Sequence, residues 1–271
     1  MANFCLLIQY DGSRYNGWQR QGNTQNTIQE KLETILETLY GEPIDLNGSG
    51  RTDAGVHALC QVANFKIPRI LSRYSCQEIQ QYMNDSLPKD IRILGVEKAD
   101  DRFHARLSAI SKIYEYRIDC GEVANIFDRR YLVRIEEPLD FTKMREAADY
   151  LTGEHDFKSF CLAASSKDKP TCRNIKSIRF EEIEVLGEHF LQICIIGNAF
   201  LHSMVRTIVG SLVMVGKGHR EPEWMQKALL ACDRSAAGET APAQGLVFWE
   251  VAYDGERLYL PHALGSDNAH V

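Results

Sequence analysis

The segment Thr27–Gly41, with the sequence TIQEKLETILETLYG, decides how the first hundred residues are organised. It begins with a capping box, in which the Thr27 side chain accepts a hydrogen bond from the Glu30 amide and Glu30 reaches back to Thr27. Apolar residues then recur at helical spacing: Ile28, Leu32, Ile35, Leu36 and Leu39. Gly41 ends the pattern. The sequence therefore predicts a helix whose apolar face packs into a core.

The segments around this helix have strand character. Residues 4–10 are mostly apolar and end at an Asp11-Gly12 turn, which predicts a buried first strand. A second capping box, Ser75-Cys76-Gln77-Glu78, starts a helix that runs to about residue 85. Further strands are expected to end near residue 47 and to span residues 61–67 and 91–96. The order strand, helix, strand, strand, helix, strand is the split βαβ pattern of ferredoxin-like folds.

The second half of the chain divides in the same way. Strands are expected at residues 112–119, 174–185, 189–197 and 245–253, and helices from Asp140 to Gly153, at 200–215 and at 222–232. No proline-rich or serine-rich linker separates the halves, which suggests that their sheets join. We expect an α+β chain of two ferredoxin-like halves with mainly antiparallel sheets: residues 1–105, residues 106–257 and a loosely ordered tail at 258–271.

Composition limits the class of protein. The chain has 271 residues, 44% of them hydrophobic and 25% charged, which is enough for an ordinary globular core. No run reaches the ~18 apolar residues of a membrane helix, and residues 4–8 are too short for a signal peptide, so a cytoplasmic protein is expected. The eight cysteines contain no C-x-x-C pair and the histidines no paired spacing, which argues against a disulfide framework or a metal site.

The distribution of charge is more informative than its sum. A net charge of −6 argues mildly against a nucleic-acid partner, because a polyanion requires a basic surface. Basic residues nevertheless gather in a few short blocks, although scattered solvated charges are the more ordinary interpretation. We expect an acidic body with a basic cleft.

Residues 48–58, GSGRTDAGVHA, are the most informative stretch for function. The glycines allow the backbone to pass close to a ligand, and loops on a rigid scaffold often carry chemistry. Taken alone, Asp53 is an ordinary Asx-turn residue that hydrogen-bonds its own backbone. Its function depends on the rest of the chain.

Four ordered blocks resemble the tRNA pseudouridine synthase A family. GRTDAGVHA follows YDGSRYNGWQRQ at residues 10–21 and precedes RFHARLSAISKIYEYRI at 102–118 and GNAFLHSMVRTIVGSLVMVGKG at 197–218. The resemblance covers about residues 4–253 and implies two RRM-like halves joined around a central catalytic cleft. It also implies a homodimer that acts on tRNA, at positions 38, 39 and/or 40 of the anticodon stem-loop.

The resemblance assigns roles residue by residue. Asp53 matches the family's nucleophile, Tyr114 its pocket tyrosine and Arg206 the arginine that pairs with the aspartate. From spacing alone Tyr114 is as well explained as a strand aromatic, and Arg206 as a surface residue of an apolar helix. Arg51 and Thr52 flank the nucleophile and are expected to bind substrate, Arg51 by contacting phosphate or extruding the base. Further RNA-binding candidates are Arg20, His57, His104 and Arg106.

The implied reaction breaks the N1–C1′ bond of uridine and rejoins the base through C5. It is an isomerisation, so neither a cofactor nor a metal is expected. Asp53 can attack C1′, add to C6, or stabilise an oxocarbenium-like centre that eliminates to a glycal; analogy with other glycosidic bonds favours the ribose-centred routes. The rival function is a non-catalytic RNA-binding module with RRM-like sheets. The set Asp53, Tyr114 and Arg206 disfavours it, because binding alone requires no buried carboxylate.

Overall fold

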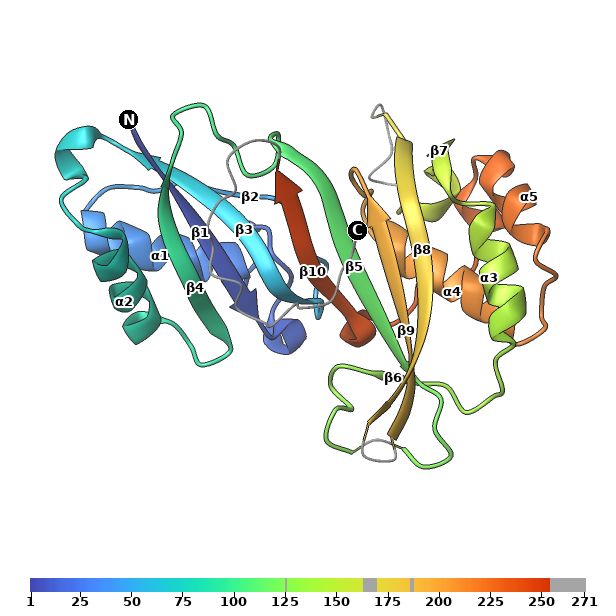
Figure 1. Cartoon of the computed structure of the whole chain (residues 1–271). Helices are drawn as coiled ribbons and strands as arrows, with labels where there is room; N and C mark the ends of the chain where they lie inside the picture. Colours follow the sequence, from blue (N-terminus) through green and yellow to red (C-terminus); the bar gives the residue numbers. More distant parts are fainter. Residues whose placement is uncertain (125, 163–169, 186–187, 254–271) are drawn as a thin grey trace.

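The strands form one continuous sheet that crosses the whole molecule (Figure 1). A computed structural model describes residues 1–124, 126–162, 170–185 and 188–253. The strand order is β4-β1-β3-β10-β5-β9-β8-β7, with β2 paired to β3 and β6 to β5. Only β10–β3 and β5–β6 pair in parallel among these described strands. The predicted α+β class with mainly antiparallel strands is confirmed.

The first half contains the two helices that the capping boxes predict and four strands. These are β1 (Ala2–Tyr10), α1 (Ile28–Tyr40), β2 (Leu46–Gly48), β3 (His57–Ile67), α2 (Cys76–Ser86) and β4 (Ile91–Ala99). At Thr27 the described contacts include only one bond of the predicted box, in which the Thr27 side chain accepts from the Glu30 amide. Ser75 and Glu78 form the complete reciprocal box. Gly41 ends α1 in the left-handed conformation, with φ of 72°.

The second half differs from the prediction at two helix ends. Its elements are β5 (Ala109–Asp119), β6 (Val133–Arg134), α3 (Phe141–Asp149), β7 (Gly153–Asp156), β8 (Cys172–Val185), β9 (Glu188–Gly197), α4 (Met204–Gly216), α5 (Trp224–Ala231) and β10 (Leu246–Tyr253). Gly153 does not end α3 but begins β7, with φ of 105°. Helix α4 begins at Met204 rather than near residue 200, because the Asn198 side chain accepts hydrogen bonds from the Asn174 and Ala199 amides in a turn before it.

Strand β10 joins the two halves. Val247 and Phe248 pair in parallel with His57 and Ala58 of β3, and on its other edge β10 pairs antiparallel with β5. The start of β3 therefore lies two strands from β5. The boundary near residue 105 remains a prediction, and the expected tail at 258–271 lies outside the described residues.

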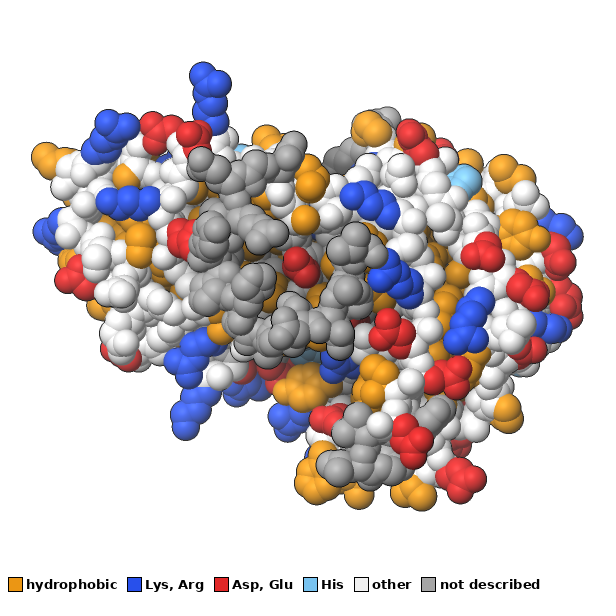
Figure 2. All heavy atoms as spheres, viewed as in Figure 1, with side chains coloured by type: hydrophobic (Ala, Val, Ile, Leu, Met, Phe, Trp, Pro, Cys, Tyr) orange, Lys and Arg blue, Asp and Glu red, His pale blue; other side chains and the backbone are white. Residues whose placement is uncertain are grey.

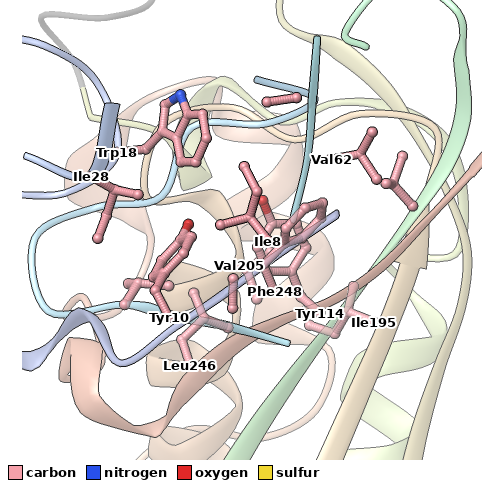
Figure 3. Packing of buried hydrophobic residues seen from close by; sticks show 14 of the residues in the cluster. Ile8, Tyr10, Trp18, Ile28, Val62, Tyr114, Ile195, Val205, Leu246 and Phe248 are labelled. Atoms are coloured by element: carbon pink, nitrogen blue, oxygen red, sulfur yellow. The ribbon is translucent and has the colours of Figure 1, made fainter. Parts of the chain in front are cut away.

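The core brings the central strands and the helices together. In Figure 1, α1 and α4 lie behind the sheet. Figure 3 shows Tyr10 of β1, Tyr114 of β5, Val205 of α4 and Phe248 of β10 in one buried cluster. On the face in Figure 2, acidic side chains crowd the side that carries β8, α3 and α5.

Candidate active site

The loop between β2 and β3, residues 49–56, carries Asp53. The side chain of Gln61 on β3 holds the start of this loop by hydrogen bonds. The Gln61 side chain is fully buried: its Oε1 accepts from Ser49 Oγ at 2.7 Å and its Nε2 donates to the Gly50 carbonyl at 2.9 Å. A tight turn follows, in which the Val56 amide donates to the Asp53 carbonyl at 3.1 Å and Gly55 has φ of 81°. These contacts hold Asp53 at a defined position above β3.

The N-terminal block YDGSRYNGWQRQ supports the same loop. The Trp18 amide donates to the Thr52 carbonyl at 3.0 Å, and a Cβ on Gly17 would lie 2.7 Å from that oxygen. A Cβ on Gly12 would lie 2.0 Å from the Val56 carbonyl oxygen. Trp18, which the sequence left open between core and function, is 1% exposed and packs against Gly48. The block therefore positions the loop through close backbone contact.

Three side chains of the second half converge on the Asp53 carboxylate. Oδ2 accepts hydrogen bonds from Arg206 Nη1 and Ser203 Oγ, both at 2.8 Å. Oδ1 lies 3.2 Å from His202 Nε2. The Asp53 side chain is 15% exposed and that of Arg206 18%, so this ion pair is shielded from water but remains accessible. With Tyr114, these residues constitute the Asp53 site.

The surroundings keep Asp53 ionised. Burial alone would raise the pKa of the carboxyl group, but hydrogen bonds from His202, Ser203 and Arg206 outweigh it and lower that pKa to about 2. The same hydrogen bond raises the pKa of His202 above its ordinary value. Asp53 also lies at the N-terminal end of α4, where the helix dipole favours an anion. The site therefore holds a fixed carboxylate anion.

The local backbone of α4 aims both donors at Asp53. Arg206 Nε donates to the Ala241 carbonyl at 2.7 Å, which leaves Nη1 directed at the carboxylate. Ser203, the residue before α4, has φ of 58°, an unfavourable left-handed conformation for a residue with a side chain. Its hydroxyl does not cap the helix but donates to Asp53. Such strain is found where function requires a fixed geometry.

Tyr114 lines the site from β5. Its side chain is 6% exposed, and its ring centroid lies 4.9 Å from that of Phe248 and 5.1 Å from that of Phe200. A Cβ on Gly50 would lie 3.4 Å from the Tyr114 hydroxyl, so the glycine leaves this oxygen clear. Burial, with smaller contributions from Tyr10 and Asp53, raises the pKa of Tyr114, and the group is a neutral phenol. Tyr116, by contrast, donates to the Pro242 carbonyl at 2.8 Å and is 1% exposed, which is a core position.

The two neighbours of Asp53 face opposite ways. Arg51 is exposed, and its side chain has no hydrogen bond or ion pair among the residues described here. Thr52 is buried: its hydroxyl lies 2.8 Å from that of Tyr10. The expectation that the Thr52 side chain binds substrate is therefore not supported, since it packs under the loop rather than beside Asp53.

The four RNA-binding candidates differ in their exposure and in their hydrogen-bond partners. His57 is only 3% exposed and its Nδ1 accepts from the Gly12 amide at 3.1 Å, so it cannot contact RNA from this position. His104 accepts from the Arg106 amide and stabilises a turn. Arg20 is exposed but donates to Glu33 at 2.9 Å. Arg106 is exposed with an unpaired guanidinium within the described structure, which leaves it the strongest candidate of the four.

Ser203 and His202 are the site residues that sequence reasoning missed. Both lie in the block GNAFLHSMVRTIVGSLVMVGKG beside Arg206. Ser203 has a left-handed backbone, and both side chains contact the same carboxylate as Arg206. The spacing of the residues does not predict this backbone conformation. Within the described ranges, no helix is long and apolar enough to cross a membrane, and no group of three or more His, Cys, Asp or Glu side chains could hold a metal ion.

Comparison with known proteins accounts for this arrangement. A family model described as tRNA pseudouridine synthase matches residues 6–107 and 147–254. A tRNA pseudouridine synthase A of Bacillus sp. (strain KSM-64) is 44% identical over 253 residues, 93% of this chain and 100% of the relative. A tRNA pseudouridine synthase A 1 of Desulfotalea psychrophila is 42% identical over 259 residues, with the same coverage of both chains. A solved Cbf5-Nop10-Gar1 complex aligns at a TM-score of only 0.33 and 11% identity, over 78% of this chain and 44% of that chain, too weakly to bear on the fold. The chain belongs to the tRNA pseudouridine synthase family.

Proposed function

We propose that this protein isomerises uridine to pseudouridine in tRNA, with Asp53 as the catalytic carboxylate. The observation that carries the proposal is the ionised Asp53, fixed by Arg206, Ser203 and His202 beside a neutral tyrosine. Binding alone would not require a carboxylate anion shielded from water, because such a group repels a phosphate backbone and is costly to bury. A nucleophile or a stabiliser of positive charge does require one.

In the proposed reaction Asp53 acts at the ribose. As the N1–C1′ bond breaks, positive charge develops at C1′, and the nearby carboxylate stabilises it or traps it as an ester. The detached uracil turns, C5 bonds to C1′, the C5 proton leaves, and N1 gains a proton. Bonds and electrons balance without an oxidant or a cofactor.

Tyr114 is proposed to hold the base during this turn. Its ring is fixed against Phe248 and Phe200, and its hydroxyl faces the space above Gly50. Burial raises the pKa of Tyr114, so its phenol does not persist as an anion. We therefore propose that it relays the proton from C5, accepting that proton on its oxygen as it releases its own. Arg51 is proposed to contact the phosphate of a nucleotide that leaves its stack, and its exposure supports this role.

Release of tritium from tRNA that carries [5-³H]uridine tests this function. Wild-type protein should release the C5 tritium, whereas Asp53→Asn and Asp53→Ala should release none above background while still binding tRNA. If the wild type binds tRNA tightly and releases no tritium from any tRNA pool, the protein is an RNA-binding module instead.

The finer assignments rest on the family resemblance. We propose positions 38, 39 and/or 40 of the anticodon stem-loop as targets, a cytoplasmic location and a homodimer. Mapping pseudouridine in tRNA from cells that lack the gene identifies the positions, and sedimentation equilibrium measures the oligomeric state. A monomer at concentrations that support full turnover would contradict the dimer.

A further inference from the structure

Four cations beside the Asp53 site have no acidic partner among the residues that the structure describes. They are Arg51, Arg106, Lys112 and Arg173, which we call the cation cluster. Two other cations, on β5 and β6, are paired, Arg117 with Glu115 and Arg134 with Asp119. The cluster is unusual because its cations lie within electrostatic reach of one another in a chain of net charge −6, and this proximity requires an explanation.

Lys112 is the centre of the cluster. Its residue is only 8% exposed, and its ammonium has no hydrogen bond or ion pair within the described ranges. Lys112 and Tyr114 are two residues apart on β5, so their side chains leave the same face of the sheet. A Cβ on Gly50 would lie 3.9 Å from Lys112 Nζ and 3.4 Å from the Tyr114 hydroxyl. The ammonium and the phenol therefore border the same space over the Asp53 loop.

The cations lie close enough to repel one another. Burial, then the charges of Arg106 and Arg173, lowers the pKa of Lys112 to about 8. Burial and Arg106 also lower the pKa of Arg51. Arg173 donates from Nη1 to the Pro170 and Cys172 carbonyls, whereas its buried Nε has no hydrogen-bond partner within the described part of the chain. Repulsion between the cations and the burial of most of the Lys112 side chain both disfavour folding, and an anion placed between these groups would offset both costs.

We propose that the cation cluster is an anion subsite, centred on Lys112, that holds one backbone phosphate next to the extruded uridine. The proposal rests on the proposed function, since the anion is taken to belong to the RNA substrate. A phosphodiester suits the site because it presents charged oxygens to several donors at once. In this position it would fix the ribose against Asp53 while Tyr114 holds the base.

Salt dependence of binding tests the subsite without turnover. In an Asp53→Asn background, Lys112→Met should weaken tRNA binding about tenfold, the order expected for a lost charged hydrogen bond. It should also reduce the slope of log affinity against log salt by about 0.7–0.9, the value for one phosphate contact. The matched control Lys227→Met, on exposed α5, should change neither. Unchanged affinity and slope in Lys112→Met would overturn the proposal.

Neutral phosphate substitution identifies the contact. In tRNA that carries a single methylphosphonate, one linkage near the target uridine should weaken binding to the protein with Lys112 but cause no further loss in Lys112→Met. Equal losses in both proteins at every linkage would refute the subsite.

Stability separates a binding role from a structural one. Lys112→Met removes a largely desolvated charge that Arg106 and Arg173 repel, and methionine keeps an unbranched side chain of similar size. The melting temperature should therefore rise while affinity falls. A lower melting temperature would mean that Lys112 supports the fold and would contradict the proposal. If Lys112 is coupled to one phosphate but the wild-type protein releases no tritium from any tRNA pool, the isomerase is refuted and the anion subsite stands.

Discussion

At the residue scale, Arg206 is the main counter-charge of Asp53. Its Nη1 is 2.8 Å from the carboxylate, and its Nε is held by the Ala241 carbonyl. Arg206→Ala should lower kcat by about 10²–10³, the usual effect of removing one charge-stabilising donor, while tRNA affinity changes little. Single-turnover kinetics and equilibrium binding measure the two effects, with Arg145→Ala as a matched control, since Arg145 lies on α3 and pairs with Glu182 rather than with Asp53. Normal turnover in Arg206→Ala would contradict the assigned role.

The pKa of Asp53 gives a prediction about acid stability. Its folded-state pKa of about 2 lies below the ordinary 3.8, so folding favours the ionised form. The resulting stabilisation is fully present above about pH 4 and is lost as the pH falls toward 2. The melting temperature of the wild type, relative to that of Asp53→Asn, should therefore fall across this interval. A difference that stays constant from pH 5 to pH 2 would show that Asp53 is not stabilised as an anion.

Sequence motifs located the residues of the proposed active site but not all of the residues that support them. Asp53, Tyr114 and Arg206 occur in blocks with a recognisable order, and the structure brings them together. Thr52 looked equally exposed to substrate, yet its hydroxyl points to Tyr10. The difference lies in backbone direction within an irregular loop, which neighbouring residue types do not determine.

At the element scale, the N-terminus of α4 has no side-chain cap, because the Ser203 hydroxyl is directed at Asp53 instead. Ser203 occupies the cap position in the left-handed conformation and donates to Asp53. Ser203→Ala should lose the hydrogen bond and keep the strain, whereas Ser203→Gly should lose the bond and relieve the strain. The glycine variant should be about 1 kcal/mol more stable than the alanine variant, with a similar loss of kcat in both.

Thermal denaturation and tritium release measure these two properties. Equal stability of the two variants would mean that Ser203 is not strained. Retained turnover in either would mean that its hydroxyl is dispensable.

Local rules predicted some elements better than others. The capping boxes at Thr27 and Ser75 marked the first two helices, because a cap is formed by residues three apart. Strand β7 escaped prediction, since its four residues, Gly153–Asp156, follow α3 directly and form a ladder only with the distant β8. The parallel pairing of β10 with β3 could not be predicted either, because no local sequence pattern determines which distant strands pair.

At the scale of the whole molecule, β10 connects the half that carries Asp53 with the half that carries Arg206. Val247 pairs with His57 on one side and with Glu115 on the other. Val247→Pro removes an amide from this central strand, and a loss of about 3 kcal/mol in the free energy of unfolding is expected. Turnover should fall with it, because Asp53 and Arg206 belong to the two halves that this strand joins.

Urea denaturation and tritium release at a temperature where the variant stays folded measure the two effects. Val247→Ile keeps the amide and should behave like the wild type. A fully active Val247→Pro variant would mean that the halves are held in place without β10.

The position of β10 along the chain also orders events during synthesis on the ribosome. Strands β3 and β5 leave the ribosome well before β10 and, until it arrives, each presents an open edge to neighbouring chains. Every residue of the Asp53 site has been made by then, yet the strand that aligns them is missing. A nascent chain therefore passes through a stage in which it is inactive and prone to aggregation. Insertion of β10 covers the open strand edges and aligns the Asp53 site in one step.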